Sequence, residues 1–208
     1  MLVNPMTALA FLDFARKNKA KAVVLTAAAS ALGKMTTVLM ERCGIKILHV
    51  VRSQAGVEEL QKISRQHIMN STDPDFVTEF RAWCLEHNAR LIFDAVGGEL
   101  VNQLLDEMPS GATIILYGNL SKQKVEFMPP QLIRENKKLI GFFLGHYVQE
   151  QGMLKTLINL RKVNRMLKGG MASRVQGVFA LNEVQKAIET YEENMGKGKV
   201  LLRPHAWE

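Results

Sequence analysis

The chain has 208 residues, of which 47% are hydrophobic and 23% charged, and its formal net charge is +7 at pH 7. This composition is typical of a folded globular domain and excludes a disordered chain. Because no apolar run reaches the roughly 18 residues that span a membrane, and the start lacks a secretory signal, we expect a cytoplasmic protein without a membrane anchor.

Short apolar runs alternate along the chain with amphipathic segments of helical period. This alternation is typical of β-α-β units that build a parallel sheet. Strands are predicted at residues 22–26, 45–51, 66–69, 90–95, 113–117, 139–144 and 199–202. Helices are predicted at about 5–19, 35–44, 57–63, 76–84, 100–105, 149–167 and from 182 onward.

Several of these helices begin or end at residues that usually mark helix boundaries. Asn4-Pro5 and Asp73-Pro74 each pair a capping residue with a proline suited to the first helical turn. Asn182 is expected to cap the last helix, and Gly169-Gly170 is expected to end the helix before it. The segment around Pro129-Pro130 is expected to be a loop.

These elements predict a single α/β domain over residues 1–208. Its core is expected to be a doubly wound parallel six-stranded Rossmann sheet with helices on both faces. Residues 1–20 and 145–208 are interpreted as flanking helices and a closing strand.

The turn after the first strand has small residues at every third position. In dinucleotide-binding proteins a glycine-rich turn here lets backbone amides at a helix start bind the pyrophosphate. Two of the three usual glycines are replaced by alanine and serine, so this segment alone fits a plain turn equally well. If a dinucleotide binds, the expected contacts at this turn are Ala27, Ser30, Ala31, Leu32 and Gly33.

The end of the second strand favours one dinucleotide over the other. An NAD site usually has a carboxylate here that bonds the ribose 2′-hydroxyl, whereas this strand ends in Arg52 and Ser53. A guanidinium and a hydroxyl suit the extra charge of a 2′-phosphate, so NADP(H) is favoured over NAD. The alternative is that Arg52 is a surface residue at a strand end.

The ligand of an open α/β sheet lies outside the carboxyl ends of its strands. Small, polar or aromatic residues follow four more of the predicted strands, and each alone is also compatible with a core or turn position. Glycines there allow close backbone approach, and the aromatic rings are interpreted as a wall for a nicotinamide ring. The further candidate contacts are Asn70, Val96, Gly97, Gly98, Tyr117, Gly118, Phe142, Phe143 and Leu144.

Other chemistry is less favoured. The five histidines and two cysteines show no metal-ligand spacing, so no metal site is predicted. His146 lies near the presumed nicotinamide end and is kept as an alternative proton donor. Residues 121–174 hold eleven Lys or Arg against three Glu, which we interpret as a solvated basic face rather than a nucleic-acid site.

Taken in order, these pieces resemble the cofactor domain of medium-chain dehydrogenases/reductases of the quinone oxidoreductase and enoyl reductase type. The pieces that carry the resemblance are Val3-Asn4-Pro5-Met6-Thr7-Ala8, Ala27–Gly33, Val51-Arg52-Ser53, Asn70-Ser71, Phe93–Gly98, Tyr117–Ser121 and Gly198–Leu202. The resemblance implies bound NADPH and hydride transfer to a quinone, an enone or a similar conjugated carbonyl. It also implies a homodimer paired through the strand at 139–144.

The family has a barrel-like N-terminal domain before the Asn-Pro segment, and that domain forms one wall of the substrate cleft. Met1 falls almost at this junction, so we expect the flanking segments to dock to a domain that the sequence lacks. For this reason the resemblance implies cofactor contacts and no catalytic residue. The alternative function is a non-catalytic Rossmann-fold subunit or interaction module, which the two replaced glycines of the turn also fit.

Overall fold

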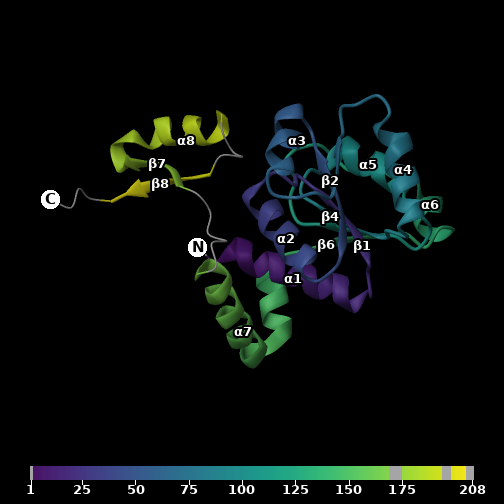
Figure 1. Cartoon of the computed structure of the whole chain (residues 1–208), viewed down its shortest axis with the longest axis horizontal. Coiled ribbons are helices and arrows are strands. Elements are labelled where there is room, and N and C mark those ends of the chain that lie inside the picture. The colour runs from purple at the N-terminus through teal and green to yellow at the C-terminus, as the bar shows by residue number, and fades with distance from the viewer. Residues whose placement is uncertain (1, 169–174, 194–197, 205–208) are drawn as a thin grey trace.

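The computed structural model describes residues 2–168, 175–193 and 198–204 (Figure 1). One sheet contains β1 Ala22–Thr26, β2 Lys46–Val51, β3 His67–Asn70, β4 Leu91–Asp94, β5 Thr113–Leu116 and β6 Lys138–Gly141. The helices around it are α1 Val3–Lys17, α2 Ala31–Arg42, α3 Gln54–Gln61, α4 Phe76–Glu86, α5 Gly98–Glu107, α6 Pro129–Ile133 and α7 Leu144–Lys168. The C-terminal elements are β7 Val175–Ala180, the 3-10 turn Leu181–Glu183, α8 Val184–Glu193 and β8 Lys199–Arg203.

The strands of the large sheet are all parallel and lie in the order β3-β2-β1-β4-β5-β6. The chain places β2 and β3 on one side of β1 and then returns to begin β4 on the other side. Crossover helices bury both faces of such a sheet, and β1 is accordingly buried at every position. The predicted doubly wound, six-stranded Rossmann sheet with helices on both faces is confirmed.

Successive residues of the strands enter two separate core layers because strand side chains alternate in direction. On one face, Val24 and Ile92 pack in a layer with α4 and α5. On the other face, Leu25 and Phe93 pack in a layer with α1, α2 and α3. The Phe93 ring stacks there on Phe11 at a centroid distance of 4.4 Å. The two layers hold the strand ends, and therefore the candidate site, in fixed positions.

Helix α7 is broken at Gly152, whose φ of +74° is not helical. The first half packs along α1, where the Tyr147 hydroxyl donates to Asp13 Oδ2 at 2.7 Å. The second half reverses direction and packs an apolar stripe against α1 and α2. The helix predicted at 149–167 therefore begins earlier, at Leu144, and glycine supplies the left-handed backbone that its reversal requires.

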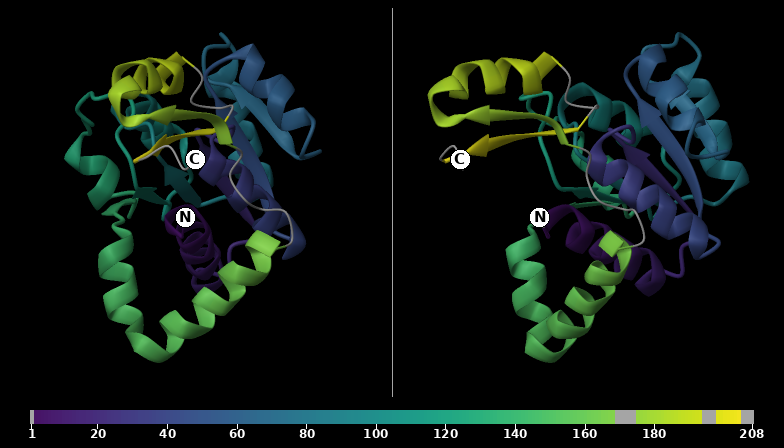
Figure 2. Two further views of the ribbon diagram at one scale, coloured as in Figure 1. Left: turned by 90° about the vertical axis from the view of Figure 1, so that its left-hand side faces the viewer. Right: turned by 60° about the vertical axis from the view of Figure 1, so that its left-hand side comes forward.

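The C-terminal elements form a small unit of their own, which we call the β7–α8–β8 unit. β7 and β8 pair in parallel as a two-stranded sheet, and α8 packs on both strands (Figure 2). The predicted closing strand 199–202 is β8, but its partner is β7 and not a strand of the large sheet. β7 was not predicted, because Gln176 and Gly177 interrupt its apolar run.

Two predicted N-terminal helix caps in the first half of the chain were wrong. α1 begins at Val3, so Asn4 is not its N-cap and Pro5 is the third helical residue. Proline fits there because the first amides of a helix have no intrahelical acceptor. α4 begins at Phe76, so Asp73-Pro74 lies in the preceding turn.

Later boundaries also differ from the sequence predictions. Asn182 lies inside the 3-10 turn and is not the cap of α8. Pro129-Pro130, predicted as a loop, opens the short helix α6, where the fixed φ of proline is favourable. β4, β5 and β6 end one to three residues early, because the apolar residues that follow them belong to loops and to the start of α7. Gly169-Gly170 lies outside the described residues.

Candidate functional site

The carboxyl ends of the parallel strands meet along one edge of the sheet. Thr26 of β1 is level with Val50 of β2, and Leu25 is level with Phe93 of β4. The same register continues outward to β3, β5 and β6. This edge gathers, in sheet order, Asn70, Arg52-Ser53, Ala27–Gly33, Val96–Gly98, Tyr117-Gly118 and Phe142–Leu144.

The turn from β1 into α2 is short and closely hydrogen-bonded. Ala27 adopts a φ of +47°, in the left-handed region that favours glycine, and its carbonyl accepts from Ser30 N at 2.9 Å. Ser30 is the N-cap of α2, and its Oγ accepts from Gly33 N at 3.0 Å. The amides of Ala31 and Leu32 begin the helix, where no intrahelical acceptor exists. These two amides form the positive end of the helix dipole, and the Ser30 hydroxyl lies beside them at the N-cap.

Gly33 is required by the close approach of α2 to the turn. A β-carbon at this position would lie 2.3 Å from the carbonyl oxygen of Ala28, a contact that real side chains do not make. The structure thus agrees with the expectation that glycine here serves helix–strand packing.

Arg52 and Ser53 follow β2 directly beside this turn. Arg52 is exposed, and its guanidinium forms no ion pair with any residue that the structure describes. Ser53 is the N-cap of α3, and its Oγ accepts from Gly56 N at 3.3 Å. The end of β2 therefore presents an unpaired cation and a capping hydroxyl close to the N-terminus of α2.

Asn70, at the end of β3, uses its side chain within its own turn. Its Oδ1 accepts from Thr72 N at 3.3 Å, and its Nδ2 donates to Asp73 Oδ1 at 3.2 Å. The side chain is therefore held in the turn at the outer part of the edge, and its contact with a cofactor stays a prediction.

A buried hydrogen-bond network joins β1 to β4 beneath the edge. Thr26 Oγ1 donates to Asp94 Oδ1 at 2.7 Å and accepts from Ala95 N at 3.0 Å. Asp94 Oδ2 accepts from Gly97 N at 2.7 Å. Burial raises the pKa of Asp94, and the hydrogen bonds from Thr26 and Gly97 oppose that rise. The network fixes the glycine pair, whose φ values are +72° at Gly97 and +58° at Gly98.

No role was predicted for Thr26 or Asp94, although Asp94 belongs to the motif Phe93–Gly98. The signal was present, because a polar residue ends each of two apolar strands. Buried polar groups need hydrogen-bond partners, so polar ends of adjacent strands are expected to bond to each other.

The loop after β5 lies against the loop after β4. Leu120 N donates to the carbonyl of Ala95 at 2.9 Å, and Ser121 N donates to that of Val96 at 2.9 Å. A β-carbon at Gly118 would lie 2.9 Å from the carbonyl oxygen of Ala95, so glycine permits this contact.

The aromatic residues of the edge point in different directions. Tyr117 packs on Phe11 at a centroid distance of 4.8 Å, and its hydroxyl is buried without a hydrogen-bond partner in the described chain. Phe142 also packs on Phe11, whereas the side chain of Phe143 is 66% exposed. Leu144 begins α7 and packs in a core layer. Phe143 is thus the most exposed of the three predicted rings, Tyr117 and Phe142 are partly buried, and their contact with a nicotinamide stays a prediction.

The sequence model of the family described as zinc-binding dehydrogenase matches residues 31–160. The chain belongs to that family. The match begins at the first residue of α2 and ends inside the second half of α7, so it contains most of the large sheet. The resemblance to medium-chain dehydrogenases/reductases that the motifs indicated is confirmed.

Relatives of this zinc-binding dehydrogenase family member are reductases of greater length. Human mitochondrial enoyl-[acyl-carrier-protein] reductase is 25% identical over 210 residues, which cover 96% of this chain and 55% of that protein. A candidate NADPH:quinone reductase from Mesorhizobium loti has a TM-score of 0.86 at 30% identity, covering 98% of this chain and 59% of that one. A 2-haloacrylate reductase, at 21% identity and a TM-score of 0.83, shares the fold and covers 99% of this chain. The chain spans about half the length of the curated relatives it matches.

The family name raises the question of zinc. Within residues 2–168, 175–193 and 198–204, no three His, Cys, Asp or Glu side chains gather closely enough to hold a metal ion. These residues therefore do not fit a zinc site. In the same part of the chain, no helix has both the length and the apolar character needed to cross a membrane.

Two cavities, of about 410 and 350 Å³, lie at the opposite edge of the sheet, where the strands begin. Basic side chains such as Lys21 and Arg90 line the larger one, and Lys46 and Arg65 line the smaller one. The helix-start amides and the glycine turns lie at the carboxyl edge, so these cavities are not part of the candidate site.

Proposed function

We propose that this chain is the NADP(H)-binding part of an oxidoreductase that transfers hydride to a quinone, an enone or a similar conjugated carbonyl. The observation that carries the proposal is the unpaired Arg52, which stands beside the N-terminus of α2 with Ser53 next to it. The names of the human and Mesorhizobium loti relatives, an enoyl reductase and a candidate NADPH:quinone reductase, support it. Because the chain spans about half of such proteins, the reduction is proposed for a longer enzyme.

Each part of the carboxyl edge would bind a different part of the cofactor. The amides of Ala31 and Leu32 and the Ser30 hydroxyl would donate to the pyrophosphate. Arg52 and Ser53 would hold the 2′-phosphate through charge-assisted hydrogen bonds. Bound NADPH supplies the hydride, and the protein orients its ring.

The remaining predicted contacts lie toward the nicotinamide end. The glycine turns at 97–98 and 118 would allow the cofactor close to the backbone, and the Thr26–Asp94 network holds Gly97 in place. The exposed ring of Phe143 would lie nearest the nicotinamide.

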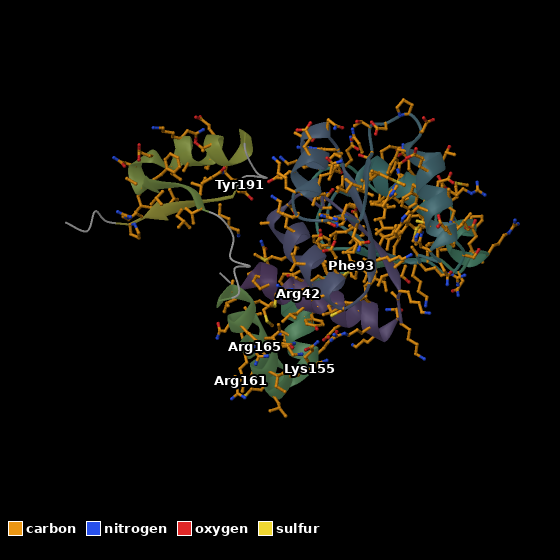
Figure 3. The ribbon with its side chains drawn as sticks, viewed as in Figure 1. Arg42, Phe93, Lys155, Arg161, Arg165 and Tyr191 are labelled. Carbon is orange, nitrogen blue, oxygen red and sulfur yellow. The ribbon has the colours of Figure 1, made fainter. Side chains whose placement is uncertain are left out.

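Titration of the chain with NADPH and with NADH tests this proposal. NADPH is expected to bind more tightly, and Arg52→Gln should weaken NADPH binding roughly tenfold while leaving NADH binding unchanged. The matched control is Arg42→Gln, which removes an exposed arginine at the far end of α2 (Figure 3). Equal affinity for the two nucleotides would contradict the NADP(H) preference. Binding of neither would favour a non-catalytic Rossmann-fold subunit.

We further infer that residues 1–20 and 145–208 flank the cofactor domain and dock to the part of the longer enzyme that this chain lacks. The exposed apolar side chains of the β7–α8–β8 unit support this, and they are Val178, Val184, Ile188, Tyr191, Leu201 and Leu202. We expect backbone amides of this unit to exchange with solvent faster in the isolated chain than those of β1 and β4.

A homodimer through the strand predicted at 139–144 is also proposed. β6 is an edge strand, and its exposed Ile140 and unpaired outer backbone groups suit pairing with a second copy. Sedimentation velocity should show a dimer that Ile140→Lys converts to a monomer. A monomeric wild-type chain would contradict this pairing and would leave the cofactor proposal unaffected.

A further inference from the structure

The second half of α7 carries a compact row of exposed aliphatic side chains. Met153, Leu154, Leu157 and Ile158 directly follow the bend at Gly152 and are 82%, 76%, 51% and 44% exposed. Their spacing of one and four residues places them on one side of the helix. We call this set the α7 tip.

The opposite side of the same half-helix is fixed in the core. Val163 and Met166 are buried in a layer with Met6 of α1 and Met35 of α2. The α7 tip therefore cannot turn inward, and only one side of the helix is open to a partner.

Basic side chains continue the outer face beyond the aliphatic row. Arg161, Lys162 and Arg165 are exposed, and none forms an ion pair with a described residue. Residues 153–168 contain no Asp or Glu. Figure 3 shows Arg161 and Arg165 on this part of the helix, whereas Lys155 pairs with Asp13 of α1 at 3.5 Å.

The α7 tip projects from the molecule. In the view of Figure 1 and in both views of Figure 2, the bend of α7 is the lowest part of the chain. The start of α1 and the β7–α8–β8 unit lie above it in all three views. The exposed apolar side chains of the β7–α8–β8 unit, which support the proposed docking to a longer enzyme, are thus separate from the tip.

We infer that the α7 tip binds an anionic lipid surface, with its aliphatic row at the acyl boundary and its basic side chains among the headgroups. A helix that projects from the molecule and is exposed on a single side is suited to contact with a flat surface. The groove of an acidic protein would have to enclose more of the helix, and α1 and α2 already occupy that space. This inference is independent of cofactor binding.

Co-sedimentation of the whole chain with lipid vesicles tests the inference. We expect binding to phosphatidylcholine vesicles that contain phosphatidylserine, little binding to phosphatidylcholine alone, and weakening by salt. Leu154→Ser with Leu157→Ser should reduce binding roughly tenfold or more, because two aliphatic anchors are lost. Arg161→Gln with Arg165→Gln should reduce it by a factor on the order of ten as well.

The matched control combines Leu85→Ser with Lys122→Gln, which changes one exposed apolar and one exposed basic residue away from α7. It should bind vesicles as the wild type does, and all variants should bind NADPH equally. Absent vesicle binding, equal binding to the two kinds of vesicle, or binding that survives Leu154→Ser with Leu157→Ser would overturn the inference. Binding to polyglutamate but not to vesicles would instead assign the tip to an acidic protein.

Discussion

The large sheet and the β7–α8–β8 unit differ in how completely their strands are buried. β1 is buried at every position between two helical layers, whereas β7 has no fully buried residue. Both contain parallel strands and an amphipathic helix, so local sequence pattern does not distinguish them. The difference is a second covering layer, which the large sheet has and which the described residues do not supply to the small unit. An incomplete layer marks the place where further protein is expected.

The largest expected difference between the two regions is in the free energy of unfolding that is lost when one aromatic side chain in each is truncated to alanine. Phe93→Ala removes a fully buried ring and should lower the free energy of unfolding by about 4 kcal/mol. Tyr191→Ala, which truncates a side chain of α8 that is 41% exposed, should change it by less than about 0.5 kcal/mol. Urea denaturation measures both (the two residues are labelled in Figure 3). Comparable losses would show that the small unit is as well packed as the sheet.

Acid should destabilise the large sheet through His49. The ring lies between Thr37 Oγ1, 2.9 Å from Nε2, and the carbonyl of His67, 3.2 Å from Nδ1. Burial lowers the pKa of His49 from 6.5 to about 4, so the unfolded chain binds the proton first as the pH falls. Stability should therefore drop by about 3 kcal/mol between pH 6.5 and pH 4, at 1.36 kcal/mol for each pKa unit.

The pH profile of urea denaturation measures this loss. His49→Gln should flatten the profile, and the exposed-residue control His67→Gln should leave it unchanged. An unchanged slope in His49→Gln would assign the acid sensitivity to other groups.

A smaller loss of stability is expected when the Thr26–Asp94 hydrogen-bond network between β1 and β4 is disrupted. Thr26→Val keeps the volume but leaves Asp94 Oδ1 and Ala95 N without their partner, at a cost of about 2 kcal/mol. Thr26→Ser keeps the hydroxyl and should therefore lower the stability less than Thr26→Val does. Thermal unfolding of both variants gives the comparison, and equal losses of stability would mean that the methyl group contributes as much as the hydrogen bonds.

The smallest expected effect is a gain in stability. Tyr117→Phe removes a buried hydroxyl that has no partner in the described chain and should stabilise the protein by about 1 kcal/mol. Tyr147→Phe is the opposite case, because its hydroxyl donates to Asp13, and it should destabilise. Destabilisation by Tyr117→Phe would reveal a partner for that hydroxyl.

Much of the fold could be predicted because buried parallel strands are nearly continuous apolar runs. The strands β1, β2, β4 and β5 follow that pattern, and the order of the sheet follows from doubly wound topology. β7 could not be predicted in this way, because an exposed strand needs no apolar run. The N-terminal caps of α1 and α4 were misassigned because capping residues also occur in turns and inside first helical turns.

The positions of the backbone turns in the candidate site could be predicted from the sequence. The directions of its side chains could be predicted less well. The turn at 27–33 and the glycines at 97–98 lie at the expected edge, because register places them there. The direction of the Tyr117 ring depends on Phe11 of α1, more than a hundred positions earlier in the chain, which sequence pattern cannot relate to it. The partnership of Thr26 and Asp94 was also missed, although each is the polar end of an apolar strand.

The β1–β4 pairing has a consequence for how the molecule folds. Thr26 and Asp94 are 68 residues apart, whereas β1 and β2 are joined by a single crossover helix. Closing so long a loop costs entropy before any contact offsets it, so the central pair should form after each β-α-β half has condensed. Pulse-labelled amide exchange during refolding should therefore protect β1 with β2, and β4 with β5, before the seam between the halves. The residues that shape the candidate site would then be the last of the sheet to reach their places.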